Sequence, residues 1–484
     1  METLISKDIN EAKQGEVYAP FANDPNTYHK KFYIESYGCA MNFSDSEIVA
    51  SILNEKGFGA TRMIEEADLI FINTCSIREK AEQTVRNKLQ NYRTFKKENP
   101  SLLVGVLGCM AERYGKELAE ALPEADAILG FDDYQDISKR LNTILSGGSI
   151  DVHVPRDRRT ILPISPINRQ SVNEATKSKF GQGARLIRKR LDNAPIASLK
   201  IASGCDRRCT FCAIPQFRGS FDSRPPTEII EEAKWLAANG VSEIFLVSEN
   251  TTSYGKDFGD LKLMEAMLPE LSKIDGIERI RLSYLQPAEI RPTLLQAMVS
   301  REKVLPYFDI SFQHASGALL RRMRRFGDSE KFLLLLSQIR ALSPAAGIRS
   351  NFIVGFPGET EAEYEELKSF IIESRLDAIG IFGYSDEDGT EAETLPDKLD
   401  QREIRNRVEE VNSLVEQLLS DRASERIGEE VVVLVEDRAT QEGRAAHQGP
   451  EVDGSTYLLN SAAAVGSYVK ARVVATDGAD LHAN

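Results

Sequence analysis

The sequence contains no apolar run that approaches the ~20 residues of a membrane-spanning helix. Its first twenty residues, METLISKDINEAKQGEVYAP, lack the basic and apolar regions of a secretory signal peptide. Both absences favour a protein of the cytoplasm with no membrane partner. Disulfides are rare in that compartment, so six cysteines in 484 residues do not predict a disulfide framework.

An excess of basic residues is also lacking. The 60 Lys and Arg residues are outnumbered by 74 Asp and Glu residues, and the net charge is −14. Non-specific binding of nucleic acid usually requires a basic surface, so this chain would need a local basic patch to bind phosphate. Its length exceeds that of a single typical core and predicts two to four domains.

Three of the six cysteines, Cys205, Cys209 and Cys212, lie within the nine residues GCDRRCTFC. A structural zinc site would normally need a fourth ligand, and the nearest histidines are distant, at His153 and His314. Three thiolates on a cubic iron–sulfur cluster leave one iron with an open position for chemistry. The spacing therefore favours a reactive cluster over a structural metal.

This CxxxCxxC loop closely resembles the signature of the radical S-adenosylmethionine (SAM) enzymes. The preceding residues 197–204, ASLKIASG, are typical of a short buried strand, and Phe211 supplies the aromatic residue expected before the last cysteine. The resemblance implies a [4Fe–4S] cluster whose open iron binds the amino and carboxylate groups of SAM. One electron would then split SAM and yield a 5′-deoxyadenosyl radical.

Strand and helix patterns alternate after this loop and predict about six βα units. Such units form a parallel sheet with covering helices, here an α/β partial (βα)6 barrel. Ligands of parallel sheets bind at the carboxyl ends of strands. Residues at these ends are therefore candidates for binding SAM, although polar residues there are often only helix caps. They are Ser248, Glu249 and Asn250, where the resemblance places the SAM amino group, Gln313 and His314, and Gly355 and Gly358, whose small size admits the adenosyl part.

The other three cysteines follow three successive strand patterns in the first part of the chain. Cys39, Cys75 and Cys109 each lie in the loop between a strand and a helix, and Ser44 or Asp45 is expected to cap the first of these helices, with Glu47 in its first turn. In a parallel sheet the three loops are neighbours, and helix N-termini lower thiol pKa values. We expect a second, auxiliary three-cysteine cluster; scattered buried thiols are the alternative.

Together, these motifs and a C-terminal β pattern resemble the methylthiotransferases of the radical-SAM superfamily over roughly residues 31–484. The resemblance implies two [4Fe–4S] clusters and two uses of SAM, one to methylate sulfur on the auxiliary cluster and one to activate a C–H bond. An electron donor and a sulfur source are implied partners. Two other readings stay open: a metalloprotein with structural cysteines, and a radical-SAM enzyme with an electron-relay cluster.

The expected organisation has five parts: a flexible segment 1–30, an N-terminal parallel-sheet domain 31–147 with the auxiliary cluster, a linker 148–196, a radical-SAM core 197–420, and a small β-barrel 421–484 that resembles a TRAM domain, a fold that often binds RNA. The linker contains the basic runs Arg156–Arg159 and Arg185–Arg190, which are expected to be solvated or to touch ribosomal RNA.

The family has two main bacterial branches. One modifies an isopentenylated adenosine beside the anticodon of tRNA, and the other modifies an aspartate of small-subunit ribosomal protein number twelve. Residues 31 to about 112, with YGCAMNFSDSE and NTCSIREKAEQ, resemble the tRNA branch. The sequence from about Cys109 onward, with CDRRCTFCAIPQFRGSFDSRP and FQHASGALLRRMRRFGD, resembles the ribosomal-protein branch. The chain thus has the pattern of a hybrid, natural or constructed.

Charge favours a protein substrate. Residues 421–484 contain six basic and eleven acidic residues, whereas a barrel that grips tRNA should be basic. Asp386, Glu387 and Asp388 stand at a strand end where the tRNA branch typically has an arginine. An acidic surface suits a basic ribosomal protein or the ribosome, with tRNA as the alternative partner; an ordinary solvated surface would look the same.

Overall fold

The computed structural model describes residues 30–55, 57–75, 87–88, 91–92, 94–155, 188–450 and 453–484. Residues 1–29 of the expected flexible segment and most of the expected linker lie outside these residues, and Lys30 begins the first strand. The described residues divide into two compact units. The first holds the chain up to Asn193 together with Ser203–Cys205 and Ile214–Glu231, and the second holds the remainder.

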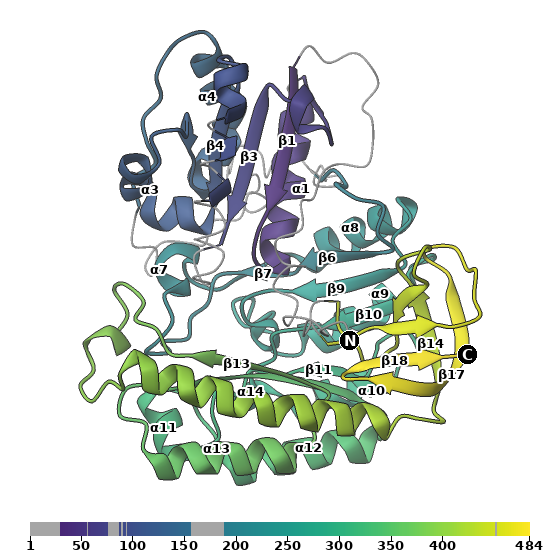
Figure 1. Ribbon diagram of the computed structural model, residues 1–484. Coiled ribbons are helices and arrows are strands. Elements are labelled where there is room, and N and C mark those ends of the chain that lie inside the picture. Colours follow the sequence, from purple (N-terminus) through teal and green to yellow (C-terminus); the bar gives the residue numbers. More distant parts are fainter. Residues whose placement is uncertain are drawn as a thin grey trace, which may run out of the picture. The chain divides into compact units, whose positions relative to one another are not determined.

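The first unit is built on a parallel five-stranded sheet with the strand order β2-β1-β3-β4-β5. Figure 1 shows β1, β3 and β4 running side by side. The central strand β3 reads LIFINT and is buried along its whole length, as expected for a parallel strand with both faces covered. The strands are β1 (Lys30–Ser36), β2 (Phe58–Ala60), β3 (Leu69–Thr74), β4 (Leu103–Gly108) and β5 (Ala127–Ile128).

Helices α1 (Ala40–Glu55), α3 (Cys109–Ala121) and α4 (Ile137–Leu145) pack around this sheet, with the short helices η2 (Ile64–Glu66) and η3 (Phe131–Asp136). The first unit also contains α7 (Ile214–Arg218) and β8 (Asp222–Ser223), and α8 (Pro226–Ala238) begins in it. The expected cap of the first helix is wrong. Helix α1 begins at Ala40, so Ser44, Asp45 and Glu47 lie inside it, with their side chains buried.

Part of the expected linker is packed rather than solvated. Arg188 and Arg190 are described, and both approach the carboxylate of Glu47, at 2.5 and 3.4 Å. Arg190 also pairs with Asp192. A buried carboxylate inside α1 needs such cations, because a lone buried charge is costly. Residues 156–187, with the other arginines of the two basic runs, lie outside the described residues.

The second unit contains six consecutive parallel strands in two three-stranded sheets, β6-β9-β10 and β11-β12-β13. Parallel bridges from Ile280 to Val304 and from Leu285 to Ile310 continue the series between the two sheets. The predicted partial (βα)6 barrel is confirmed. Its strands are β6 (Ile196–Lys200), β9 (Glu243–Val247), β10 (Arg279–Leu282), β11 (Tyr307–Asp309), β12 (Gly347–Val354) and β13 (Ala378–Gly383).

Helices alternate with these strands, as the sequence periodicity predicts. They are α9 (Leu263–Ser272), α10 (Pro292–Val299), α11 (Gly317–Arg322), α12 (Ser329–Leu342), α13 (Glu361–Ser374) and α14 (Gln401–Ser424), with short turns at η4 (Thr251–Ser253), η5 (Pro287–Glu289) and η6 (Ala392–Thr394). The two residues Ala202–Ser203 form β7. No helix of the described residues is long and apolar enough to cross a membrane.

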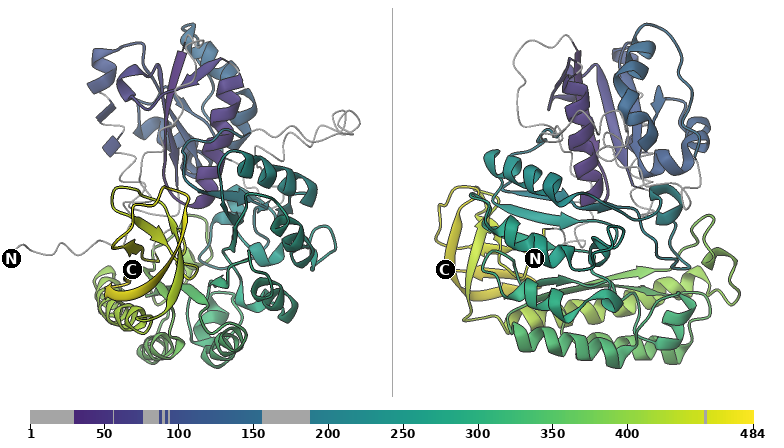
Figure 2. Two further views of the ribbon diagram at one scale, coloured as in Figure 1. Left: turned by 90° about the vertical axis from the view of Figure 1, so that its right-hand side faces the viewer. Right: turned by 180° about the vertical axis from the view of Figure 1, so that it is seen from behind.

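The chain continues from α14 into a closed β-barrel with the order β14-β15-β16-β18-β17, drawn in yellow in Figure 2. This confirms the predicted small C-terminal barrel. Its core is a cluster of small and β-branched side chains that includes Val433, Val435 and Ala471. The strands are β14 (Glu430–Val435), β15 (Glu442–Arg444), β16 (Thr456–Leu458), β17 (Tyr468–Asp477) and β18 (Asp480–Ala483).

A buried ion cluster joins the barrel to β9 and β10 within the second unit. The fully buried Glu243 carboxylate lies 3.1 Å from Arg281 and from Arg444, and 3.7 Å from Arg279. Burial alone would raise the pKa of Glu243, but the three guanidinium charges lower it from 4.5 to about 2. This ion cluster is therefore part of what holds the barrel against the core.

We expect Glu243→Gln to destabilise the second unit by roughly 3–5 kcal/mol at pH 7, because it leaves buried arginines without their counter-charge. Because folding lowers the pKa of Glu243, its ionised carboxylate stabilises the folded state above pH 4.5. This stabilisation is lost as the pH falls from 4.5 towards about 2. Denaturant unfolding at pH 7 and pH 3 measures both effects. Glu430→Gln, which changes a well-exposed carboxylate, is the control; equal midpoints for the two variants at pH 7 would contradict the cluster's role.

Candidate active site

The carboxyl ends of three neighbouring strands carry Cys39, Cys75 and Cys109. Cys75 directly follows β3, Cys109 directly follows β4 and opens α3, and Cys39 lies between β1 and α1. Strands β1, β3 and β4 are adjacent and parallel, so the three loops share one edge of the sheet. The predicted convergence of these loops is therefore present.

A glycine brings two of these loops into contact. Gly38 has a φ of +107°, and a Cβ atom built on it would lie 2.6 Å from the Cβ and 3.0 Å from the Sγ of Cys75. Only glycine combines this backbone conformation with so close an approach. Asn42, in the first turn of α1, donates hydrogen bonds to the carbonyls of Tyr37 and Thr74 and fixes the same two loops to each other.

The thiol of Cys109 is fully enclosed at this edge. Burial raises its pKa to about 12, the charge of Arg218 opposes that rise, and the nearby Cys75 and Cys39 add to it. A thiolate is stabilised here only if positive charge is supplied. Three cysteines that meet at one edge of the sheet form a donor set that fits an iron–sulfur cluster, whose ligands are thiolates.

No three His, Cys, Asp or Glu side chains within the described part of the chain lie close enough to hold a single metal ion. The finding does not bear on a cubane cluster, because each cysteine there binds a different iron and the sulfur atoms stand farther apart. The assignment of the six cysteines to two clusters stays a prediction.

Arg218 is a site residue that the sequence pattern did not reveal. Its guanidinium donates to the Sγ of Cys109 at 3.2 Å, to the Oδ1 of Asn42 at 3.0 Å and to the Oδ2 of Asp45 at 2.9 Å. It also lies over the ring of Phe131 at 4.3 Å. Arg218 is buried, and its place at the end of α7, six residues after Cys212, gave no periodic signal.

The same segment supports the start of the cysteine-rich loop. The backbone N–H of Cys205 donates to the carbonyl of Gly219 at 3.0 Å. Gly204 has a φ of +79°, and a Cβ there would lie 2.1 Å from the carbonyl oxygen of Ser220. The chain on either side of Arg218 thus touches the first cysteine of the loop through its backbone and Cys109 through the arginine side chain.

The rest of the loop lies in the second unit. The N–H of Cys212 donates to the carbonyl of Cys209, and the guanidinium of Arg325 lies 3.8 Å from the Sγ of Cys209. Thr210 donates to the carbonyls of Met323 and Arg322. All three loop cysteines are partly exposed, which suits ligands of an iron that must remain open to SAM.

Polar residues at the end of β9 form a connected group. The Oγ of Ser248 accepts from the N–H of Asn250, and Glu249 lies partly buried between them. The amide of Asn250 donates to Glu289 at 2.9 Å. Glu289, which the sequence did not single out, also accepts from Ser253 and Arg207. Burial opposes ionisation, but the Arg207 charge and these hydrogen bonds lower the pKa of Glu289.

The other predicted strand-end residues take different positions. Gln313 has a φ of 72° and pairs through its backbone with Asn351 and Ile353 of β12. His314 is fully buried; its Nδ1 accepts from the N–H of Ser316, and its Nε2 lies 3.6 Å from Glu359. These contacts give His314 a packing role in the described structure, so its contact with SAM is a prediction without direct geometric support.

Gly355 and Gly358 follow β12 and both have positive φ angles, of +78° and +74°. A Cβ on Gly355 would lie 2.6 Å from Ile404, so this glycine is needed for packing against α14. A Cβ on Gly358 would meet only the side chain of Arg322, at 3.7 Å. Of the two, Gly358 has the room beside it that an approaching ligand requires.

Comparison with known proteins decides the family. The chain matches the models of an uncharacterized protein family, UPF0004, over residues 31–130, of the radical SAM superfamily over residues 199–371, and of the TRAM domain over residues 427–484. It is 56% identical to ribosomal protein uS12 methylthiotransferase RimO of Nocardioides sp., over 92% of this chain and 95% of that protein. The RimO of Streptomyces coelicolor is 54% identical over 92% of this chain and 94% of its own length.

The chain belongs to the RimO family of radical-SAM methylthiotransferases. The RimO match includes most of residues 31–112, the segment that resembles the tRNA branch, because only 8% of the chain lies outside it. Among solved structures, the radical SAM methyltransferase TsrM from Kitasatospora setae superposes with a TM-score of 0.50 at 13% identity, over 73% of each chain. That likeness shows the fold alone.

As a radical-SAM methylthiotransferase of the RimO family, the enzyme uses SAM and [4Fe–4S] clusters. The resemblance seen in the cysteine spacing is therefore confirmed at the level of family, reaction type and cofactors. The residues that hold each cofactor are not tested by the comparisons.

The acidic triplet of this RimO-family chain lies after β13, but its charge is partly compensated. Asp386 accepts from the hydroxyl of Tyr384 at 2.9 Å and pairs with Lys398 at 2.8 Å. Asp388 is exposed, and Glu387 is partly buried. The triplet therefore presents less free negative charge than its sequence indicates.

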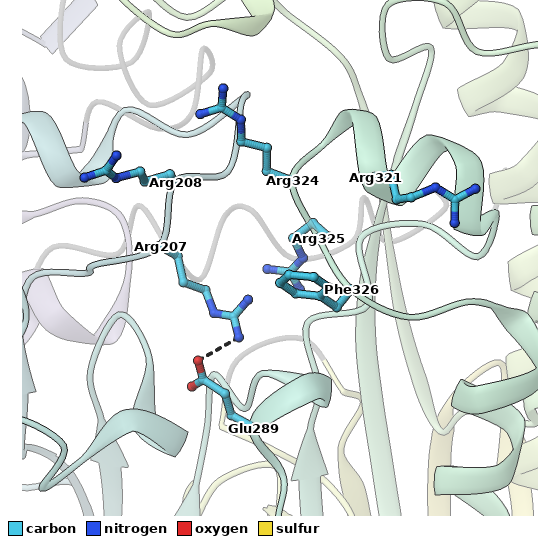
Figure 3. A pocket seen from close by; sticks show the side chains of 7 residues that line it. All are labelled: Arg207, Arg208, Glu289, Arg321, Arg324, Arg325 and Phe326. Carbon is cyan, nitrogen blue, oxygen red and sulfur yellow. Dashed lines mark hydrogen bonds and ion pairs between the residues drawn. The ribbon is translucent and has the colours of Figure 1, made fainter.

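An arginine-lined pocket was also missed by sequence reasoning. Figure 3 shows Arg207 and Arg325 pointing towards its middle, with the ring of Phe326 beside Arg325, while Arg208, Arg321 and Arg324 point outwards. Glu289 closes one side through its ion pair with Arg207, at 2.7 Å. The runs DRR and RRMRRF could have indicated this pocket, had the sequence analysis paired them in space.

Proposed function

We propose that this chain transfers a methylthio group to an aspartate side chain of ribosomal protein uS12, at a C–H bond. The relatives that match nearly its whole length are named for that substrate. The observation on the chain itself that supports the proposal is the acidic surface of its C-terminal barrel, which suits a basic ribosomal protein.

Ion pairs remove acidic as well as basic charge from this surface, because Glu425 pairs with Arg375 and Arg422 and Glu430 pairs with Arg472, but acidic residues still outnumber basic ones. Of the six basic residues between 421 and 484, Arg426 is buried against Asp377, and Arg444 is buried against Glu243 and Glu436. Arg422 also pairs with Asp377. The exposed acids include Asp421, Glu425, Glu430, Asp437 and Asp477. Such a field steers a basic protein towards the barrel and repels phosphate.

We assign the two cysteine sets to two tasks. Cys205, Cys209 and Cys212 would hold the cluster that binds SAM, and Ser248, Glu249 and Asn250 are the candidates for its amino group. Cys39, Cys75 and Cys109 would hold the auxiliary cluster, whose chemistry is to carry the sulfur that is methylated and transferred. The enclosed edge of the sheet would keep water from that sulfur, because Cys75 and Cys109 are 2% and 3% exposed.

Two further partners belong to this proposal. SAM cleavage needs a one-electron donor, and methylthio transfer needs a source of sulfur. The reaction would take place in the cytoplasm, where the ribosomal protein is made and assembled. The second candidate substrate is isopentenylated tRNA, which only the character of residues 31–112 favours.

The test is to express the chain in a bacterial host that lacks both methylthiotransferases. We expect mass spectrometry to show one added methylthio group on the uS12 aspartate and none on tRNA. Expression of the triple variant C205A/C209A/C212A is the control and should leave both unmodified. Modification of isopentenylated tRNA, with uS12 unchanged, would overturn the substrate proposal but not the reaction type.

A further inference from the structure

One strongly basic surface stands out on a chain of net charge −14. It consists of Arg207, Arg208, Arg321, Arg324 and Arg325 around a hollow of about 550 Å³, together with Phe326. We call these six residues the arginine patch. All belong to the second unit, and Figure 3 shows three of the arginines directed outwards from the hollow.

The patch lies directly on the cysteine-rich loop. Arg207 and Arg208 are two of the three residues between Cys205 and Cys209. From the other side, Arg325 reaches within 3.8 Å of the Sγ of Cys209, and Thr210 donates to two carbonyls of the segment that carries the remaining arginines. A partner bound at the patch is therefore close to Cys209.

Most of the positive charge in the patch is not balanced locally. Arg207 pairs with Glu289, and Arg324 pairs with Glu391, both at 2.7 Å. Arg208 and Arg321 are exposed, and neither forms an ion pair or a side-chain hydrogen bond with any residue that the structure describes. Arg208 and Arg321 therefore present exposed guanidinium groups with which acidic side chains of a partner can pair. Asp328 is a described carboxylate whose pKa is lowered first by hydrogen bonds from Lys331 and further by the charge of Arg321.

Phe326 gives the patch an apolar anchor. Its side chain is 74% exposed, the highest value among the large apolar side chains that the structure describes as exposed. Phenylalanine and arginine are both enriched at the centres of protein interfaces.

We infer that the arginine patch is the docking surface for an acidic protein that carries a one-electron flavin or iron–sulfur group. This inference rests on the proposed assignment of Cys205, Cys209 and Cys212. The carrier is oxidised by one electron, and that electron is consumed when SAM is cleaved to methionine and the 5′-deoxyadenosyl radical. Electron transfer weakens steeply with distance, so the donor must approach the loop cysteines, and the patch adjoins Cys209.

The electron carrier and the protein substrate differ in the sign of their net charge, so they should bind to different surfaces. A basic ribosomal protein is repelled by the patch and attracted by the acidic barrel, whereas an acidic carrier is attracted by the patch and repelled by the barrel. The basic patch and the acidic barrel of the second unit would thus bind two different protein partners. Ribosomal RNA is the other anion that could reach the patch, and the experiment distinguishes it.

The experiment measures binding of reduced flavodoxin, an acidic flavin protein used as the probe, to the holoenzyme at low and high salt. We expect R208E/R321E to raise the Kd by about tenfold or more at low salt, with the difference shrinking at high salt as charges are screened. Arg405→Glu, a charge reversal at an exposed position of α14, is the matched control and should change the Kd little. Phe326→Ala should weaken binding at both salt concentrations.

A second readout ties binding to electron delivery. For each variant, the rate of 5′-deoxyadenosine formation with flavodoxin is divided by the rate with dithionite, a chemical reductant that needs no docking. We expect this ratio to fall with R208E/R321E and not with Arg405→Glu. A wild-type enzyme that forms no 5′-deoxyadenosine with dithionite would instead contradict the cluster assignment on which the inference rests.

Two results would overturn the inference. One is an equal Kd for flavodoxin in R208E/R321E and Arg405→Glu. The other is a loss of ribosomal RNA binding in R208E/R321E while flavodoxin binding is retained, which would make the patch an RNA surface.

Discussion

The triple variant C39A/C75A/C109A is expected to lose methylthio transfer to uS12 entirely while it still forms 5′-deoxyadenosine. The three cysteines meet at one enclosed edge of the first unit's sheet, and the loop cysteines that would serve SAM lie elsewhere in the sequence. Removing the distant set should therefore abolish the sulfur chemistry without removing the site of SAM cleavage.

Iron content gives an independent measurement. Wild-type enzyme should hold about eight irons per chain, and the variant about four, because each cubane contains four. The matched variant C205A/C209A/C212A should also retain about four irons, but it should form no 5′-deoxyadenosine. Circular dichroism checks that both variants are folded, since Cys75 and Cys109 are buried.

A wild-type content near four irons would show that the second cluster does not exist. Loss of all SAM cleavage in folded C39A/C75A/C109A would show that the two cysteine sets do not have separable roles. Either result leaves the family intact and changes the assignment of residues within it.

Sequence reasoning was most successful where spacing alone carries the information. Three strand–loop–helix repeats predicted that Cys39, Cys75 and Cys109 share one sheet edge, and the order β1-β3-β4 confirms this convergence. The period of the central segment predicted six parallel strands, and short strands separated by glycines predicted the closed barrel. In each case one local pattern repeats, and topology rules for parallel sheets supply the rest.

Sequence reasoning failed where a side chain acts on a residue far away in the chain. Asp45 has the residue type of a helix cap, yet it is buried within α1 because Arg218, 173 residues later, supplies its partner. Arg188 and Arg190 belong to a basic run typical of solvated linkers, but they pair with the buried Glu47. No local pattern encodes these long-range ion pairs. The same is true of the contacts around Glu289, which were also missed.

The substrate argument changed for a similar reason. Lys398 pairs with Asp386, and ion pairs in the barrel bury Arg426 and Arg444 while they also engage acids such as Glu425 and Glu430. A count of charges in the sequence treats every residue as exposed. The field at the surface depends on which charges are exposed, and this is known only once the chain is folded.

Replacing Arg218 by lysine is expected to lower the reduction potential of the auxiliary cluster by ~60 mV. Arg218 donates to the Sγ of Cys109, and hydrogen bonds to the sulfur ligands stabilise the reduced, more negative state. One such bond, at about 1.4 kcal/mol, corresponds to ~60 mV for a one-electron couple. Lysine keeps a positive charge for Asp45 but lacks the planar fork that reaches Cys109 and Asn42 together.

The choice of lysine keeps the test specific. Arg218→Met would leave the fully buried Asp45 without its cation and cost roughly 3–5 kcal/mol of stability, which would confuse a redox effect with unfolding. The potential is best measured by electron paramagnetic resonance titration in the C205A/C209A/C212A background, where the auxiliary cluster is observed alone. Arg224→Lys changes another buried arginine of the same segment and should leave the potential unchanged.

An unchanged potential in Arg218→Lys, with iron retained, would mean that Arg218 serves only to hold Asp45 and Phe131. Loss of iron would instead give it a part in assembling the cluster. A lowered potential with full iron content is the outcome expected from the geometry. Since lysine retains the positive charge that opposes the high pKa of the Cys109 thiol, the shift in potential would report the lost hydrogen bond to the Sγ of Cys109.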